Sequence, residues 1–196
     1  MSSRPLKAAV GLAAAGALAL AAPPAHAADD PDPAVWSQLS AVFAATGGYQ
    51  YEPLAVRDGF EATPCAEMPG EGGMGYHYFN KANIGKITPT TPGALLYEDG
   101  PDGQRRLIGV EWLADAATTA TAPTLFGQTF RDARPYGEPL NGNFYTLHAW
   151  IYKDNPDGLF GRWNPDVKCP AGVPTLVTPT MTPTAAPTTP SSAPAH

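Results

Sequence analysis

The chain has 196 residues and carries 12 Lys or Arg against 18 Asp or Glu, which gives a formal net charge of −6 at pH 7. An acidic chain without a basic cluster lacks the electrostatic surface that nucleic acid or anionic lipid would require. Composition therefore argues against a nucleic-acid partner, and the length fits one domain of ordinary size with additional segments at its ends.

Residues 1–27 have the features of a secretory signal peptide. Arg4 and Lys7 precede an apolar run over 8–22, and Ala25-His26-Ala27 forms a small-x-small cleavage site. The run is shorter than the roughly 20 residues that a membrane-spanning helix needs. We expect an exported, extracytoplasmic protein with no membrane association after signal removal, and its net charge falls to −8 without Arg4 and Lys7.

The next segment, "DPAVWSQLSAVFAATGG", predicts a helix. Asp32 suits the N-cap, Pro33 the first helical position and Gly47 the end. "EPLAVRDGF" predicts a shorter helical turn that begins at Pro53 and ends at Gly59.

After Cys65 the pattern becomes that of strands, rich in aromatic and branched residues. An Asp-Gly turn around Asp102-Gly103 joins the second and third of them, and the stretch 115–143 before the last is expected to be a long loop. Helices first and antiparallel strands afterwards predict an α+β fold, with N-terminal helices packed on a curved antiparallel sheet of about four or more strands. The four expected strands are "YHYF", "ALLYE", "RLIGVEWLA" and "YTLHAWIY".

The C-terminal residues differ sharply from the rest of the chain. From Pro174 on they are Pro, Thr, Ala and Ser with no acidic or basic side chain other than the final His196. Such a segment cannot bury enough apolar surface to offset its ordering entropy. We therefore expect a disordered Pro/Thr-rich tail over 173–196 and a single domain over 28–172.

The two cysteines, Cys65 and Cys169, are far apart in the sequence and form no C-x-x-C motif. In an exported chain an even count predicts a structural disulfide. The bridge would join a residue just before the first strand to the end of the core. Closing a loop of this length stabilises a fold by roughly 4–5 kcal/mol in chain-entropy terms.

Two familiar motifs fail on their context. Residues 70–75 spell G-x-G-x-x-G, but they open a predicted strand, whereas a dinucleotide-binding loop follows a strand and opens a helix. "DNPDGLFGRWNPD" lacks the oxygen ligands of an EF-hand and predicts a tight turn followed by a loop. The sequence also argues against a nucleophilic serine, because the only serines outside the predicted signal peptide and tail, Ser37 and Ser40, lie in the predicted first helix and no G-x-S-x-G elbow is present.

The main candidates for a functional site are His77 and His148, which are the two histidines outside the predicted signal peptide and tail. Both lie in predicted strands, as do Glu98 and Glu111. Two histidines and one carboxylate could bind a divalent metal such as zinc or iron. A two-residue turn places Glu98 opposite Leu107 and leaves the two glutamates ~13 Å apart along the sheet. Glu111 is central in its strand, so His77, Glu111 and His148 form the candidate metal site.

Two other interpretations of the same histidines stay open. In the first, His77 and His148 are half-buried residues that are hydrogen-bonded to Tyr or Glu and bind no metal. In the second, the two histidines act as a general acid/base pair. The aromatic residues indicate a different kind of site: Tyr76, Tyr78 and Trp150 are candidate ligand-binding residues. Together with several tyrosines, Trp112, Trp150 and Trp163 would line a groove for a sugar or another flat apolar ligand, although aromatic residues at strand spacing more often build the core.

Five segments together resemble an uncharacterised family of exported bacterial proteins, frequent in actinobacteria. Its members carry M-G-x-H-Y-x-N, V-E-[YW], L-F-G-x-x-F and L-H-x-W…N-P-x-G-x-F-x-x-[WY]-N-P motifs. The resemblance covers roughly residues 55–170 and implies export and one shared domain, with no established activity, ligand or catalytic residue. The segments in this chain are "GMGYHYFN", "LLYED", "RLIGVEWL", "LFGQTF" and "LHAWIYKDNPDGLFGRWNPDVKC".

These observations lead to one leading hypothesis and two alternatives. The leading hypothesis is a secreted domain that binds a small ligand or a metal ion through a His/Glu site on its sheet. The first alternative is a metal-dependent or acid/base enzyme that uses the same residues, with Glu98 as a further carboxylate. The second is a structural or carbohydrate-contacting module of the cell envelope, with the tail as a spacer.

Overall fold

The structure is a computed structural model and describes residues 32–133, 143–173 and 175–176. The predicted signal peptide lies outside the described residues. Of the predicted tail, the described residues are Val173, Thr175 and Leu176. No helix in the described ranges combines the length and the apolar character needed to cross a bilayer.

Two helices come first, α1 (Pro33–Thr46) and α2 (Glu52–Arg57), and the strands follow. The start of α1 is the predicted one: Asp32 is the N-cap, and its Oδ1 accepts a hydrogen bond of 2.7 Å from the Ala34 backbone N–H. Leu39 and Val42 on one stripe of α1 are fully buried against the sheet. The α+β prediction with N-terminal helices is confirmed.

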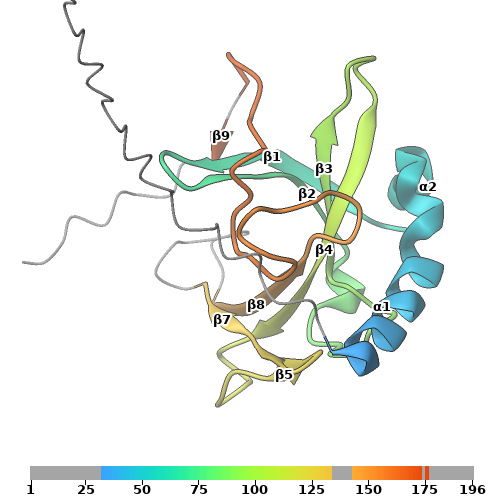
Figure 1. The fold of residues 1–196 in the computed structure, drawn as a ribbon, viewed down its shortest axis with the longest axis vertical. Helices are drawn as coiled ribbons and strands as arrows, with labels where there is room; N and C mark the ends of the chain where they lie inside the picture. Colours follow the sequence, from blue (N-terminus) through green and yellow to red (C-terminus); the bar gives the residue numbers. More distant parts are fainter. Residues whose placement is uncertain (1–31, 134–142, 174, 177–196) are drawn as a thin grey trace, which may run out of the picture.

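The strands form one curled sheet in the order β7-β8-β4-β3-β2-β1-β9, antiparallel except for the pairing of β9 with β1. Both helices lie on one side of it (Figure 1). A separate two-stranded hairpin consists of β5 and β6. The strand bounds are β1 (Glu61–Met68), β2 (Gly72–Phe79), β3 (Ala94–Asp99), β4 (Arg105–Asp115), β5 (Thr124–Leu125), β6 (Gln128–Thr129), β7 (Arg131–Asp132), β8 (Phe144–Ala149) and β9 (Thr175–Leu176).

Two local expectations were wrong. Cys65 lies inside a strand, β1, and not before the first strand. Pro64 obscures this strand in the sequence, and the sheet accommodates the proline at a register shift between Ala62 and Cys65. The predicted loop over 115–143 contains three short strands in its described part: β5, β6 and β7.

The sheet has two faces with different coverings. We call the side under the helices the helix face; it carries Tyr76, Tyr78 and Trp112 among the main core residues. Alternate residues of the same strands point to the other side, which we call the histidine face. Two smaller apolar clusters lie there, one around Leu96 and Trp150 and one around Phe79.

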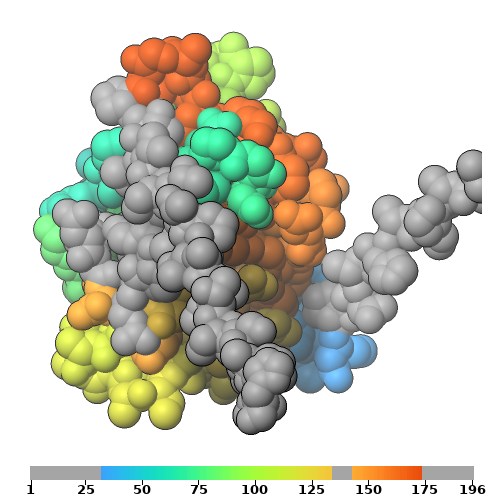
Figure 2. All heavy atoms as spheres, turned by 90° about the vertical axis from the view of Figure 1, so that its left-hand side faces the viewer, coloured from blue at the N-terminus to red at the C-terminus, as the bar shows by residue number. Residues whose placement is uncertain are grey.

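The segment that follows β8 packs against the β1–β2 hairpin. Gly73 and Asn164 exchange two backbone hydrogen bonds of 3.0 Å. A Cβ at Gly72 would overlap the Asn164 carbonyl group, so the glycines of the G-x-G-x-x-G string permit close backbone approach within a strand pair. The space-filling view shows the teal hairpin next to the orange segment (Figure 2). The string opens strand β2, as expected, and no helix.

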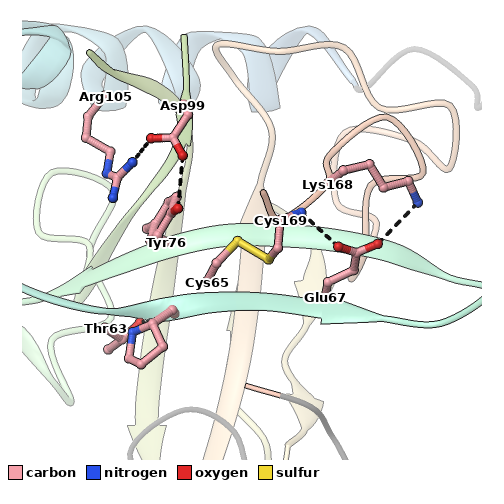
Figure 3. The surroundings of a disulfide bond; sticks show 9 residues. Thr63, Cys65, Glu67, Tyr76, Asp99, Arg105, Lys168 and Cys169 are labelled. Atoms are coloured by element: carbon pink, nitrogen blue, oxygen red, sulfur yellow. Dashed lines mark hydrogen bonds and ion pairs between the residues drawn. A yellow bond between two sulfur atoms is a disulfide. The ribbon is translucent and has the colours of Figure 1, made fainter. Parts of the chain in front are cut away.

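The predicted disulfide is confirmed. Cys65 and Cys169 are bonded, with 5.8 Å between their Cα atoms, and tie β1 to the segment after β8 (Figure 3). Beside the bridge, the Cys169 backbone N–H donates to Glu67 Oε2 at 2.8 Å. Burying this polar group costs little because it is hydrogen-bonded.

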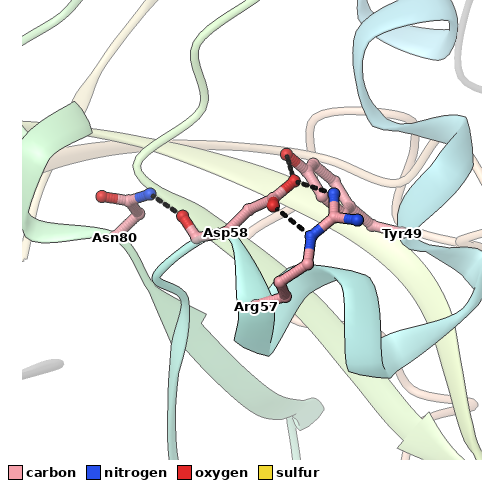
Figure 4. A network of polar contacts seen from close by, with 4 residues as sticks. All are labelled: Tyr49, Arg57, Asp58 and Asn80. Carbon is pink, nitrogen blue, oxygen red and sulfur yellow. Dashed lines mark hydrogen bonds and ion pairs between the residues drawn. The ribbon is translucent and has the colours of Figure 1, made fainter.

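A polar network joins the end of α2 to the end of β2 (Figure 4). The Asp58 carboxylate pairs with the Arg57 guanidinium at 2.8 Å and accepts from the Tyr49 hydroxyl at 3.3 Å. The Asn80 side chain donates to the Asp58 carbonyl at 3.1 Å. The network thus anchors the chain where it leaves the strand that carries His77.

Candidate metal centre

Three strands bring His77, Glu111 and His148 together on the histidine face. Glu111 of β4 lies directly opposite His148 of β8 in the antiparallel register. Glu111 is also opposite Ala94 of β3, while His77 of β2 is opposite Leu96 of the same strand. Directly opposed residues point to the same side of a sheet, so all three side chains converge across β3. His77 and Glu111 are therefore offset diagonally by two residues across β3, because Ala94 is opposite Glu111 and Leu96 is opposite His77.

The ligand atoms of this trio are close in space. His148 Nε2 is 3.3 Å from Glu111 Oε1, and His77 Nε2 is 3.6 Å from Glu111 Oε2. The two imidazole rings have centroids 6.3 Å apart and are inclined at 70°. One ligand atom from each residue lies within 4.8 Å of the others. The sequence-based grouping of these three residues is therefore matched by their positions.

All three side chains are buried, with His77 2 %, Glu111 1 % and His148 3 % exposed. Aromatic rings flank the imidazoles: His77 stacks on Phe79 at 5.3 Å and His148 on Trp150 at 6.4 Å. Such an apolar setting disfavours charge on an imidazole. The neutral imidazole is also the form that binds metals.

The pKa values of both histidines reflect this burial. Desolvation lowers the pKa of His77 from 6.5 to about 3. Desolvation is also the main cause that lowers the pKa of His148 well below 6.5, and repulsion from His77, Arg162 and Arg131 adds to it. Both imidazoles are neutral at pH 7 as a result.

One nitrogen of each of the two histidines is buried without a hydrogen bond to another described residue. Among the described residues, neither His77 Nδ1 nor His148 Nε2 has a hydrogen-bond partner. His148 Nε2 faces a carboxylate oxygen at 3.3 Å but is not oriented to donate to it. Buried polar atoms are normally satisfied, so an orphaned imidazole nitrogen calls for an explanation.

The spacing agrees with the donor set of a transition-metal site. Bond lengths of about 2.0–2.1 Å to zinc imply neighbouring donors about 3.4 Å apart in a tetrahedron. The distances of 3.3 Å from His148 Nε2 to Glu111 Oε1 and 3.6 Å from His77 Nε2 to Glu111 Oε2 fall on either side of that value, and one ligand atom from each of the three residues lies within 4.8 Å of the others. Two imidazoles and one carboxylate suit Zn²⁺ or Fe²⁺ better than Ca²⁺ or Mg²⁺, which prefer all-oxygen ligands.

The second strand carboxylate, Glu98, has a different environment. It lies opposite Arg106, one position from the expected Leu107, because an irregularity at Ile108 shifts the β3–β4 register. Its Oε2 pairs with Lys153 Nζ at 3.1 Å. Glu98 is not part of the described cluster, in agreement with the exclusion of both glutamates from one metal site.

The three candidate ligand-binding aromatics separate onto the two faces. Tyr76 and Tyr78 belong to the core of the helix face, where the Tyr76 hydroxyl donates to Asp99 at 2.9 Å. Trp150 lies on the histidine face, and its Nε1 donates to the Gly161 carbonyl at 2.7 Å. Ligand binding by these residues stays a prediction.

Two residues beside the site were not singled out in the sequence. Arg131 and Arg162 approach closely enough to lower the pKa of His148. Arg131 lies in β7 opposite Thr146, two residues before His148 in β8. No periodic signal marks Arg131, because its strand has only two residues and follows a loop-like stretch.

No protein-family model, curated protein or solved structure gives a significant match to this chain.

Proposed function

We propose that the protein binds one divalent transition-metal ion, zinc in the first instance, through His77, Glu111 and His148. The observation that carries the proposal is the convergence of two neutral, buried imidazoles on one carboxylate at 3.3 and 3.6 Å. One buried nitrogen of each histidine lacks a hydrogen-bond partner among the described residues, and for His148 it is Nε2, the nitrogen that faces Glu111. A metal ion would use lone pairs of this kind.

The proposal also includes the cellular compartment of the protein and the family to which it belongs. The disulfide between Cys65 and Cys169 supports an oxidising, extracytoplasmic compartment, because such bonds are rare in reducing ones. Export through the signal peptide over 1–27 is part of the proposal, as is membership of the exported bacterial family that the sequence resembles. The small-ligand and enzyme alternatives would use the same His/Glu site.

Metal analysis of the purified full-length chain tests the site directly. The apo protein, prepared with a chelator, is titrated with Zn²⁺ and with Co²⁺, whose visible absorption reports tetrahedral nitrogen and oxygen ligands. We expect one ion per chain in the wild type. Loss of a direct ligand in Glu111→Gln is expected to weaken binding by more than the roughly 10–100-fold that outer-shell changes cause.

Glu98→Gln is the matched control, because it removes a carboxylate from the neighbouring strand without touching the cluster. It should bind metal like the wild type. The double variant His77→Ala/His148→Ala should bind none, and His148→Gln provides a milder variant should the double one not fold. Sub-stoichiometric metal in the wild type, or equal binding by Glu111→Gln and the wild type, would contradict the proposal.

A further inference from the structure

A second candidate site lies away from the three metal ligands. A pocket of about 410 Å³ opens between the start of α1, the β5–β6 hairpin and the segment 157–161. In Figure 1 the yellow hairpin lies beside the blue first turn of α1. The volume falls within the range of small-molecule sites, about 300–1,000 Å³.

Apolar side chains form one part of this pocket. Phe126 and Phe160 stack with ring centroids 6.0 Å apart and planes at 18°. Phe126 is braced from behind by an edge contact with Trp112 at 5.1 Å. Val35 and Leu159 extend the apolar surface. Phe126 is only 2 % exposed, so it links the pocket to the main core, and the partly exposed Phe160 provides the aromatic surface of the pocket.

The backbone at Phe126 is held in an unfavourable conformation. Its φ is 55°, the only positive value among the non-glycine residues that the structure describes, and Gly127 follows at 72°. A bulky residue in the left-handed region costs roughly 1–2 kcal/mol. Strain of this kind tends to occur at binding sites, where packing holds the residue in place. Here the hairpin turn places the Phe126 ring between Trp112 and Phe160.

Polar groups of both kinds surround the apolar surface. Asp32 and Asp157 offer carboxylate acceptors, while Arg131 offers guanidinium donors and Gln128 an amide with both. One oxygen of Asp32 already accepts the N-cap hydrogen bond of α1. The rim thus has charges of opposite sign on a chain that is otherwise acidic.

We propose that this pocket binds a neutral sugar ring. Hydroxyl groups both donate and accept, so one ring can satisfy the carboxylates and the guanidinium together. The C–H face of the ring would lie on the partly exposed Phe160, which the buried Phe126 ring supports from the core side. A ligand of one charge sign would meet repulsion from either Asp157 or Arg131. None of the three metal ligands lines this pocket, so saccharide binding can be tested on the protein without a bound ion.

The test is direct binding of defined saccharides to the full-length protein. An array of neutral hexoses, N-acetylhexosamines and their disaccharides is followed by calorimetric titration of the positive members. Gln128→Trp places a large side chain at the exposed rim and should block the pocket. We expect it, and Asp157→Asn, to weaken binding of a neutral saccharide at least about tenfold, the equivalent of one hydrogen bond.

Thr129→Trp is the matched control, since Thr129 is exposed on the same strand but does not line the pocket. It should leave the saccharide affinity unchanged. The proposal is overturned by the absence of any saccharide binding, by equal loss in both tryptophan variants, or by binding of zwitterionic amino acids alone. Amino acids such as phenylalanine and leucine are therefore titrated in parallel.

Discussion

The two faces of the sheet treat buried polar groups differently. On the helix face, the Tyr97 hydroxyl donates to the Tyr49 carbonyl at 2.7 Å, and Trp112 Nε1 donates to the Thr88 carbonyl at 2.8 Å. On the histidine face, His77 Nδ1 and His148 Nε2 have no such partner within the described ranges. The buried polar groups named on the helix face are thus hydrogen-bonded, whereas each of the two histidines on the histidine face has one nitrogen whose burial is not offset by a hydrogen bond among the described residues.

The largest loss of stability is expected from truncating Trp112, the largest fully buried side chain of the helix face. Trp112→Ala removes a fully buried ring and should lower the free energy of unfolding by about 3–5 kcal/mol. Because Trp112 points away from the metal ligands, the loss should be the same in a chelator and in excess Zn²⁺. Urea unfolding under both conditions measures it. Trp36→Ala, at a side chain that is 45 % exposed, should change stability by less than about 0.5 kcal/mol.

Metal binding should stabilise the fold through the histidine face. An ion at 100 times its dissociation constant raises the free energy of unfolding by about 2.7 kcal/mol. We expect this gain in the wild type and none in His77→Ala/His148→Ala, measured by urea unfolding with and without Zn²⁺. A gain of equal size in the double variant would place the ion elsewhere in the chain.

Lowering the pH should destabilise the metal-free protein through protonation of the same two histidines in the unfolded state. Between pH 6.5 and about 3 an unfolded histidine takes up a proton while native His77 does not, so the unfolded state binds more protons. The free energy of unfolding therefore falls as the pH is lowered through this window. Each histidine contributes up to ~1.4 kcal/mol per pH unit.

The double variant His77→Ala/His148→Ala isolates this contribution. Its stability in a chelator should fall less steeply between pH 6.5 and 4 than that of the wild type, as followed by urea unfolding at several pH values. Parallel pH profiles would show that the two histidines are not buried in the neutral form.

The smallest effect is expected from a single hydroxyl of the helix face. Tyr97→Phe removes the bond to the Tyr49 carbonyl and should cost about 1 kcal/mol of stability. Zn²⁺ affinity should be unchanged, which thermal unfolding and metal titration together establish. Tyr51→Phe, at a residue that is 65 % exposed, is the control with no expected change. A change in metal affinity would mean that the two faces are coupled.

Local signals in the sequence were sufficient for the helices and for most of the sheet. Asp32, Pro33 and Gly47 act on their immediate neighbours, so the limits of α1 can be predicted without tertiary context. Pro64 conceals β1, because its compatibility with a strand depends on a register shift against β2. The shift at Ile108 that moves Glu98 to Arg106 likewise depends on packing and not on a turn motif.

The metal ligands were predictable for a different reason. Only two histidines lie outside the predicted signal peptide and tail, and both occupy strand patterns, so few groupings were possible. The complete burial of the two histidines could not be predicted from the alternation of apolar and polar residues along the strands. That pattern marks a solvent-exposed face, whereas both faces of this sheet are covered. The pocket at Phe126 and Asp32 joins the start of α1 to a hairpin far along the chain, and no sequence spacing links those residues.

The position of the three ligands on separate strands also has a consequence for folding kinetics. His77 lies in β2, but Glu111 and His148 meet only after β8 has paired with β4, late in chain order. Closing contacts over such separations is slow, because the loop entropy is lost before the contact is gained. An ion bound by all three side chains would therefore bind only once β2, β4 and β8 have come together in the sheet. It would then slow unfolding while leaving the refolding rate nearly unchanged.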